Sequence, residues 1–299
     1  MSEQVAVRHD LEHVPLGPPS ATSGLLEAFR RRYLLRLMVR REIQARYSRS
    51  IVGLGWSYIN PTVRFFTFYF VFGILIGRGM NVPNFAIHLF AGMVLVHYFT
   101  ETVNSGTRSL LSNKGIVQKM AMPRELFPFA SMLVSLYHTI PQLIILTIAC
   151  IATRTWHPDA VGFAAALLGF VLVMLFGTAL GLMFSVFNVL FRDFGRIVQT
   201  FINMVPFVVP MMYPYAIIKE RFGASPVIYA IYMWNPVAEA VLLIQRGFWW
   251  TTTDTPYLDN FPPDLWQRGF IMLGVLVVLI VIAQWVFSRL EGKVPELLT

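Results

Sequence analysis

Two ionisable side chains inside a long apolar stretch are the first candidates for chemistry in this chain. His97 and Glu101 stand four residues apart, so on a helix they share one face. Ionisable groups inside a membrane are costly, and they often serve an ion or proton pathway. The structural alternative is that Glu101, near the inner end of the stretch, pairs with an arginine from the basic segment 30–49.

Motifs for catalysis or nucleotide binding are missing from the sequence. It has no G-x-x-x-x-G-K-[ST] phosphate loop, no H-E-x-x-H and no G-x-S-x-G. The 6 histidines lack metal-ligand spacing, and the single cysteine, Cys150, lies in an apolar run and excludes a disulfide framework. We therefore expect no catalytic residue, no metal site and no cofactor bound by this chain.

The elements that position these residues are predicted to cross a membrane. Of the 299 residues 56% are hydrophobic and only 13% are charged, against about half and about a quarter in soluble domains. The fold class is therefore an all-α integral membrane protein. Apolar windows of about 20 residues predict six spans, which cover residues 59–76, 85–103, 127–153, 161–191, 197–218 and 270–287. The fourth is long enough to tilt or to break at Gly177 and Gly181, and prolines interrupt the fifth.

The segments outside the spans divide into three parts. Residues 1–29 read as a flexible cytoplasmic tail, residues 30–50 as an amphipathic interface helix, and residues 291–299 as a cytoplasmic C-terminus around the transmembrane domain 51–290. The first span begins too late for a cleavable signal peptide. The interface helix, in which Glu42 and Arg46 can pair, is either a topogenic anchor or a docking surface for a cytoplasmic partner.

Charge placement orients the spans. The net charge is +8, and a basic cluster beside a membrane span marks the cytoplasmic side rather than a nucleic-acid site. Six spans with both termini in the cytoplasm place the basic segments inside: residues 30–49, Arg108 to Arg124, Arg192 with Arg196, and Arg289 with Lys293. The region 219–268 then lies outside, as a pair of re-entrant or interfacial helices with Trp249 and Trp250 at the interface. A seventh span is the alternative, and it would break the charge pattern.

Aromatic residues are concentrated in the first and fifth spans. A corridor rich in Phe and Tyr and poor in charge suits a sliding neutral polymer, because ring faces stack on sugars. It suits a small ion badly, since ions need charged or carbonyl rings. The candidate channel-lining residues are Phe65, Phe66, Tyr69, Phe72, Phe201, Phe207 and Tyr213.

Four stretches in this order resemble the ABC-2 type permeases over roughly residues 30–290. "MVRREIQARYSRSIVGLGWSYINP" resembles the family's surface helix and the start of its first span, and "NKGIVQKMAMPRELFPF" resembles its coupling segment. "FRDFGRIVQTFINMVPFVVPMMYP" resembles the start of its fifth span, and "WNPVAEAVLLIQRGF" its outer re-entrant pair. Met122 stands before Pro123, where many relatives carry an aromatic residue.

The resemblance is closest to the Wzm-like polysaccharide-export branch. It implies a half transporter that forms a homodimer, binds two ATPase subunits in the cytoplasm, and exports a polyprenyl-diphosphate-linked polysaccharide such as an O antigen or a cell-wall galactan. ATP and Mg²⁺ would be bound by the ATPase partner. The implied ATPase-coupling residues are Arg36, Arg40, Arg41, Arg46, Asn113, Lys114, Gln118, Lys119, Pro123, Arg124 and Glu125. The implied outer gate is formed by Asn235, Pro236, Glu239 and Arg246.

Several alternatives stay open beside this reading. Within the family, a teichoic-acid exporter or a drug or small-lipid exporter is possible. From other classes, a membrane glycosyltransferase would need acidic residues on its donor side, and an ion-coupled carrier would need charged pairs near the midplane, where only His97 and Glu101 come close. ATP-dependent export separates both of these from the preferred reading.

Overall fold

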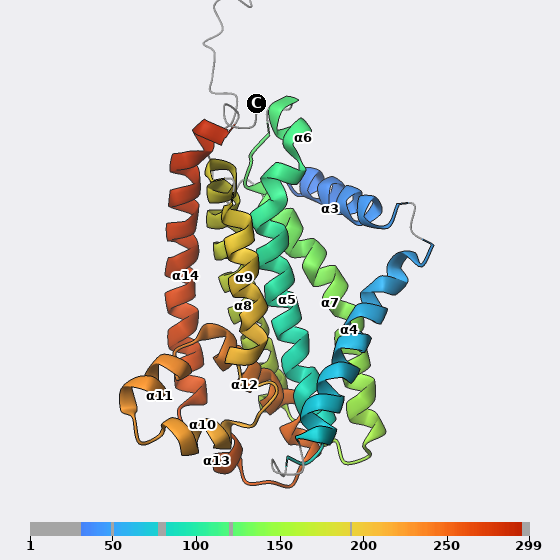
Figure 1. Ribbon diagram of the computed structural model, residues 1–299, viewed down its shortest axis with the longest axis vertical. Helices are drawn as coiled ribbons and strands as arrows, with labels where there is room; N and C mark the ends of the chain where they lie inside the picture. The colour runs from blue at the N-terminus through green and yellow to red at the C-terminus, as the bar shows by residue number, and fades with distance from the viewer. Residues whose placement is uncertain (1–30, 49–50, 77–81, 120–121, 192, 295–299) are drawn as a thin grey trace, which may run out of the picture.

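The computed structural model describes residues 31–48, 51–76, 82–119, 122–191 and 193–294, and within these ranges it contains helices and no strand (Figure 1). The predicted tail 1–29 lies outside the described residues. So do the basic residues Arg30, Arg49, Arg78 and Arg192 and most of the C-terminal segment.

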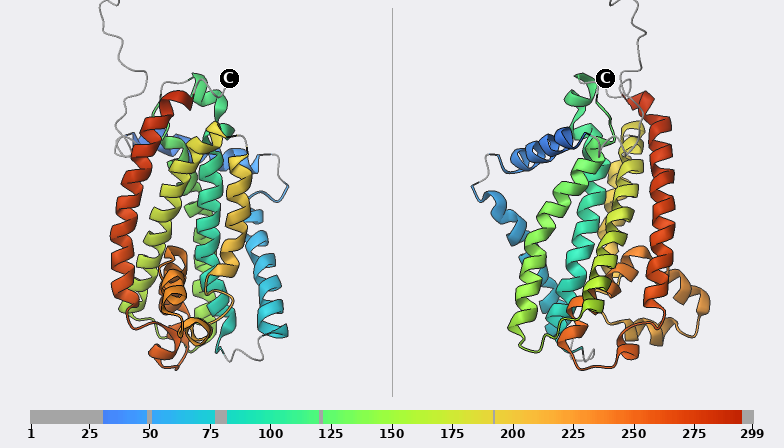
Figure 2. Two further views of the ribbon diagram at one scale, coloured as in Figure 1. Left: turned by 60° about the vertical axis from the view of Figure 1, so that its left-hand side comes forward. Right: turned by 180° about the vertical axis from the view of Figure 1, so that it is seen from behind.

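A bundle of long helices forms the body of the protein. Its members are α5 (Phe85–Ser112), α7 (Leu126–Ala152), α8 (Ala160–Leu190) and α14 (Leu265–Leu290), with the shorter α9 (Phe194–Val208) beside α5. Helix α5 lies in the middle and packs against α7, α8 and α9, as the three views show (Figures 1 and 2). In its most apolar window 78% of the residues are buried, against 22% in α14, so α5 is the most enclosed of these helices.

Small residues bring the central helices close together. A Cβ atom on Gly106 of α5 would lie 2.8 Å from the Cα of Gly181 on α8. One on Gly247 of α12 (Pro236–Phe248) would lie 2.5 Å from the carbonyl oxygen of Gly162. Backbones approach this closely only where side chains are absent, which is how helices pack when both faces are apolar.

One end of the bundle, which we call the α6 end, carries the basic segments. Helix α3 (Arg32–Tyr47) lies across this end, and α6 (Lys114–Lys119) caps it together with the short turn Glu291–Lys293 (Figure 1). Leu35 of α3 and Val117 of α6 are buried in one apolar cluster with the ends of α7, α8 and α14. The amphipathic prediction for residues 33–47 is therefore confirmed as a helix with one packed face.

Helix α4 connects α3 to the bundle. After a 3₁₀ turn at Gly53–Gly55, α4 runs over Trp56–Phe68 and continues as a π-helix over Tyr69–Leu75. Together the two segments form twenty residues of helix along α5 and α7.

The opposite end, the α13 end, carries the short helices α10 (Tyr215–Phe222), α11 (Pro226–Met233) and α13 (Tyr257–Asn260). Helix α11 and the segment of α12 with its 3₁₀ extension Trp250–Thr252 meet at an angle of 72°. Asn235 caps α12, since its side chain accepts a 3.0 Å hydrogen bond from the Val237 amide. Helix α11 is mostly exposed, whereas α12 is buried in the bundle.

The helix bounds correct part of the predicted span pattern. Among the described residues, four helices (α5, α7, α8 and α14) are long and apolar enough to span a membrane, and a fifth is added if the bent pair counts as one span. The predicted fifth span over 197–218 is not one helix, because α9 ends at Val208 and a turn that contains Pro210 and Pro214 leads to α10. Prolines lack the amide hydrogen that a continuing helix needs. Helix α8 is continuous through Gly177 and Gly181, so the allowed break there is absent.

Candidate functional site

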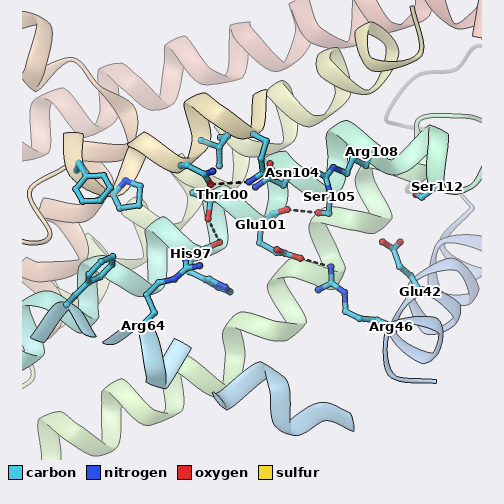
Figure 3. Close-up of a pocket in the computed structure, with 16 residues that line it drawn as sticks. Glu42, Arg46, Arg64, His97, Thr100, Glu101, Asn104, Ser105, Arg108 and Ser112 are labelled. Atoms are coloured by element: carbon cyan, nitrogen blue, oxygen red, sulfur yellow. Dashed lines mark hydrogen bonds and ion pairs between the residues drawn. The ribbon is translucent and has the colours of Figure 1, made fainter. Parts of the chain in front are cut away.

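A polar cavity of about 710 Å³ opens between α3, α4, α5 and α9. Figure 3 shows its lining, which combines guanidinium, carboxylate, amide and hydroxyl groups from all four helices. The surrounding helices are mostly apolar, so these groups gather at one place. The polar residues that line it are Glu42, Arg46, Arg64, His97, Thr100, Glu101, Asn104, Ser105, Arg108, Ser112, Gln199 and Asn203.

Glu101 lines this cavity and pairs with an arginine from the N-terminal basic segment. The Nη2 atom of Arg46 lies 2.5 Å from Oε1 of Glu101, with the two side chains 38% and 28% exposed. The structural alternative predicted for Glu101 is therefore confirmed. His97 lines the same cavity, and its Nδ1 lies 3.2 Å from Nε2 of Gln142 on α7. His97 and Glu101 thus form no isolated charged pair.

Three further contacts fasten α3 to the bundle. Arg41 donates a 3.0 Å hydrogen bond to Oδ1 of Asn113, the residue that ends α5. The hydroxyl of Tyr47 lies 3.0 Å from Nδ1 of His138 on α7 and 2.5 Å from Oγ of Ser57 on α4. Helix α3 therefore contacts α4, α5 and α7 through polar groups and not only through its apolar face.

Glu42 faces α7 rather than its helical neighbour. Its Oε1 accepts a 3.4 Å hydrogen bond from the hydroxyl of Ser131, and the predicted pair with Arg46 is replaced by the Arg46–Glu101 pair. Burial raises the pKa of the Glu42 carboxyl above its usual range, although Arg46, Ser131 and Arg41 act in the opposite direction. The charge of Glu42 therefore depends on how closely α3 is docked.

Sequence reasoning missed several residues of this cavity. Arg64 lies inside the predicted first span, and Asn104, Gln199 and Asn203 were not singled out. Arg108 was used only as a marker of orientation; here its Nη2 donates a 3.1 Å hydrogen bond to Oε1 of Gln199, which links α5 to α9. An arginine within an apolar run was the available signal, since such a residue seldom faces lipid.

The predicted ATPase-coupling residues separate into an exposed and a buried group. Arg36 and Arg40 on α3 are exposed, as are Lys114, Gln118 and Lys119 on α6. Pro123 and Glu125 are buried instead, so these two support the coupling segment from within. Asn113 holds Arg41 as described above.

The buried part of the coupling segment contacts the C-terminal end of α14. Arg124 donates to the backbone carbonyl of Glu291, and Oε1 of Glu125 accepts a 3.1 Å hydrogen bond from Nε2 of Gln284. Glu291 is only 3% exposed. Burial and the nearby Glu125 carboxylate raise the pKa of the Glu291 side chain to about 7. The end of α14 and the coupling segment are therefore joined by two side-chain hydrogen bonds.

The predicted channel-lining aromatics do not meet in one cavity. Phe207 lines the polar cavity, whereas Phe201 lines a second, apolar cavity of about 610 Å³ between α5, α8, α9 and α12. Phe65 stacks on Tyr69 with ring centroids 5.8 Å apart and packs against α5. Phe66 is 61% exposed on the outer face of α4. Of the remaining two, Phe72 packs against the core, and the Tyr213 hydroxyl lies 3.2 Å from that of Tyr232.

Two of the predicted outer-gate residues, Glu239 and Arg246, lie in α12 and are buried, whereas Asn235, which caps α12, and Pro236 are half-buried. Glu239 is 0% exposed, and its Oε2 lies 3.3 Å from Nη2 of Arg268 on α14. Arg246 makes two hydrogen bonds, of 3.2 and 2.8 Å, to the carboxylate of Asp159, which caps α8. This contact lowers the pKa of Asp159. Asn235 and Pro236 form the first turn of α12.

Within the part of the chain that the structure describes, no group of three or more His, Cys, Asp or Glu side chains is placed to hold a metal ion. Cys150 is fully buried, and its thiol points at the carbonyl of Phe248. The lining of the polar cavity offers hydrogen-bonding and charged groups.

Comparison with known proteins gives consistent relatives. The O-antigen export system permease protein RfbA of Myxococcus xanthus is 27% identical over 202 residues, which cover 67% of this chain and 75% of that protein. A protein of the same name from Klebsiella pneumoniae is 24% identical over 272 residues, covering 89% and 95%. The polysialic acid transport protein KpsM of Escherichia coli is 20% identical over 208 residues, covering 69% and 78%.

The family comparison covers most of the described helices. The ABC-2 type transporter family matches residues 33–249, from α3 through α12, and this range contains the polar cavity and the contacts that dock α3. The match extends over well more than half of the chain, and the long apolar helices agree with a multi-pass membrane permease. This chain therefore belongs to the ABC-2 type transporter family.

Proposed function

We propose that this chain is the membrane subunit of a transporter that exports a lipid-linked polysaccharide across the cytoplasmic membrane, driven by ATP hydrolysis on a separate subunit. Relatives named for O-antigen export and polysialic acid transport support this cargo class. The cargo would be of the O-antigen or cell-wall galactan type. ATP and Mg²⁺ would bind to the partner ATPase.

The observation that carries the proposal is the polar cavity. A sugar polymer presents hydroxyl groups, and it needs hydrogen-bonding partners inside the membrane because unpaired polar groups there are costly. The cavity supplies amide groups from Asn104, Gln199 and Asn203 in addition to its charged groups. Its volume of about 710 Å³ falls in the range of roughly 300–1,000 Å³ that small-molecule sites occupy.

Six spans and a homodimer complete the proposed architecture. Helix α4 with its π-helical continuation would be one span, and α9 would be another that is completed by a turn. Large apolar side chains of these two helices are exposed, among them Phe66 at 61% and Phe201 at 72%. A second copy would cover these faces and close the channel. Both termini would then lie in the cytoplasm, at or beyond the α6 end, and α11 with α12 would form the outer re-entrant pair.

Helices α3 and α6 are the proposed contacts of the ATPase. Their exposed basic side chains lie at the same end of the bundle, where two ATPase subunits would bind to a homodimer. ATP-driven closure would push these helices, and the Arg46–Glu101 and Arg41–Asn113 contacts would pass the movement to α5. Changing Gln118 and Lys119 together should lower transport-linked ATPase activity without reducing membrane insertion. Normal activity in that variant would count against the assignment.

The primary test is to deplete the protein in its host and analyse polyprenyl-diphosphate-linked glycans inside the cell. Accumulation of one finished polymer would identify the cargo and support export. Unchanged intracellular and surface glycans would reject the polysaccharide proposal.

A drug or small-lipid exporter is the second candidate, and the apolar cavity favours it. That cavity is lined mainly by Phe, Leu, Ile and Val side chains and would accept an acyl or prenyl chain. ATP-dependent export of a fluorescent lipid by vesicles that contain the complex, with no change in cell-surface glycans on depletion, would favour this candidate. A teichoic-acid cargo would instead appear in the glycan analysis as a phosphate-bearing polymer.

A further inference from the structure

The polar cavity holds more positive than negative side chains. Helix α3 contributes Glu42 and Arg46, α4 contributes Arg64, and α5 contributes His97, Glu101 and Arg108, whereas α9 contributes only neutral groups. The carboxylate of Glu101 is taken up by Arg46 at 2.5 Å, and Glu42 points toward Ser131 of α7. Two guanidinium groups, those of Arg64 and Arg108, are left without a carboxylate of their own.

Arg64 is the more unusual of the two because of its depth. It follows the first residue of α4 by eight positions, which places its Cα about 12 Å along the helix axis. In Figure 3 its side chain points into the cavity beside His97. Among the residues that the structure describes, none forms a hydrogen bond or an ion pair with Arg64. Arg64 is exposed, so its guanidinium is open to an anion that enters the cavity, and ionisable groups within membrane segments often mark functional sites.

Arg108 lies nearer the α6 end and is held by a neutral partner. Its Nη2 donates to the amide oxygen of Gln199, which fixes the direction of the guanidinium without cancelling its charge. Gln199 is in turn held by Asn203, with 3.1 Å between Nε2 and Oδ1. The remaining N–H groups of Arg108 stay available to an acceptor in the cavity.

We propose that this cavity binds the phosphate groups of a phosphorylated lipid carrier, with Arg64 and Arg108 as the residues that hold the anion. Guanidinium groups bind phosphate oxygens through two parallel hydrogen bonds, and basic pockets between membrane helices bind phosphorylated head groups. This inference rests on the proposed function, in which the glycan is carried on a polyprenyl diphosphate, and it names the residues that recognise the carrier.

A lipid carrier fits better than a free phosphate because an apolar cavity adjoins the polar one. Ile202 of α9 lines both cavities, so a polar and an apolar binding surface flank the same helix. The apolar cavity includes Phe194, Phe201 and Val208 from α9, and it has about 610 Å³ for an isoprenoid chain. A molecule with a diphosphate head and a prenyl tail matches this pair of surfaces.

The test is a binding measurement on the full-length chain in complex with its ATPase partner, in nanodiscs of neutral phosphatidylcholine. The probe is radiolabelled undecaprenyl diphosphate, and the competitors are unlabelled phosphatidylglycerol and inorganic pyrophosphate. The variants are Arg64→Gln, Arg108→Gln and the double variant. The matched control is the double variant Arg221→Gln and Arg289→Gln, which removes two exposed positive charges outside the cavity.

Each single cavity variant should bind the probe roughly tenfold more weakly, and the double variant roughly a hundredfold, since hydrogen bonds to charged groups have this strength. The control variant should bind the probe with an affinity within about threefold of that of the unmodified complex. This change is smaller than the loss of one charge-assisted hydrogen bond would cause. Size-exclusion profiles that show each variant still bound to its partner exclude misfolding as the cause. Binding by the double variant within about threefold of the unmodified complex would overturn the proposal.

The competitors distinguish the sources of the phosphate. Weak competition by phosphatidylglycerol supports a carrier site, whereas competition as strong as that of unlabelled undecaprenyl diphosphate would show a general phospholipid site and overturn the assignment. Accumulation of glycan on depletion with normal binding in the double variant would reject this inference alone. Unchanged glycans on depletion with variant-sensitive binding would reject the polysaccharide proposal and leave the phosphate site standing.

Discussion

Two ion pairs of this molecule differ in their exposure to solvent. One joins α12 to α14, and the other lines the polar cavity. Glu239 and Arg268 lie 3.3 Å apart with side chains that are 0% and 7% exposed. Arg46 and Glu101 lie 2.5 Å apart, but their side chains are 38% and 28% exposed. Burial makes the first pair costly to separate, whereas water or a ligand can replace either partner of the second.

This difference separates a fixed part of the molecule from a part that can change. Helix α12 is buried along its whole length and is fastened to α14 by Glu239 and to the start of α8 by Arg246. Helix α3 touches the bundle along one face and through polar contacts at the rim of a cavity. We infer that α12 preserves the shape of the bundle while α3 transmits movement, and the predictions below test this contrast.

The largest effect is expected from Glu239→Met. It removes one of the two carboxylates that pair with the buried Arg268 and leaves only the partly exposed Asp264, 3.3 Å away. The loss should therefore fall near the lower end of the about 3–5 kcal/mol that breaking a buried ion pair costs. Thermal unfolding of the purified complex should show a strong loss of stability and of yield.

The double variant Glu239→Met with Arg268→Met serves as the control for this prediction. Replacing both members of a buried pair by apolar groups is often close to neutral, so most of the stability should return. A single variant as stable as the unmodified protein would show that the pair does not hold α12 in place.

A smaller effect is expected from Gly247→Ala. The added Cβ atom would lie 2.5 Å from the Gly162 carbonyl oxygen and 2.8 Å from Cβ of Ala166, so α12 and α8 must separate. Overpacking of this kind costs about 1–3 kcal/mol. The matched control is Gly115→Ala in α6, where no atom lies within 4 Å of the new Cβ, and there the helix should gain up to about 1 kcal/mol. Equal melting temperatures for the two variants would contradict the packing argument.

The stability of the α6 end should depend on pH through Glu291. The pKa of Glu291 is raised to about 7 in the folded protein from an ordinary value of 4.5, so the folded state keeps a proton that the unfolded state releases. Stability should therefore fall as the pH rises from about 4.5 to about 7 and then level off, with a slope of at most about 1.4 kcal/mol per pH unit. Melting temperatures measured from pH 5 to pH 8 test this.

Glu291→Gln should remove that slope, because the neutral amide cannot ionise. Glu220→Gln, at an exposed position in α10, should retain it. An unchanged slope in the Glu291 variant would place the titrating group elsewhere.

Some parts of this fold could be predicted from the sequence and others could not. The long apolar helices and the interface helix were predicted to within five residues at each end, because their signals are local runs of hydrophobicity and charge. The exception is α5, which runs nine residues beyond the predicted end of the second span. The helix break between Val208 and Tyr215 was indicated in the sequence only by prolines. The prediction of a fifth span followed the hydrophobicity of this segment instead. Arg64 was passed over because it occupies an apolar run, and only the folded structure shows that it faces a cavity.

The predicted site residues show the limit more sharply. The cost of a lone charge in a membrane predicted that Glu101 would pair with an N-terminal arginine. The sequence did not identify Arg46 as that arginine, because the choice depends on how α3 crosses α5. The aromatic residues of α4 and α9 were grouped by composition, whereas Phe201 and Phe207 face different cavities. Side-chain direction around α9 is set by its neighbours, and no alternation in the sequence reveals it.

The smallest change in stability, and the most informative for transport, is expected from Arg46→Gln. An ion pair this exposed contributes at most about 1 kcal/mol, so the melting temperature should barely move. Cargo-stimulated ATPase activity should nevertheless fall, because α3 loses its contact with the middle of α5. Arg32→Gln, at an exposed position at the start of the same helix, should leave both properties unchanged. If the contact acts as one unit, Glu101→Gln and the double variant should lose as much activity as Arg46→Gln alone. Losses that add in the double variant would mean that the two residues act on transport separately, and the contrast between a fixed α12 and a transmitting α3 would then need another basis than this pair.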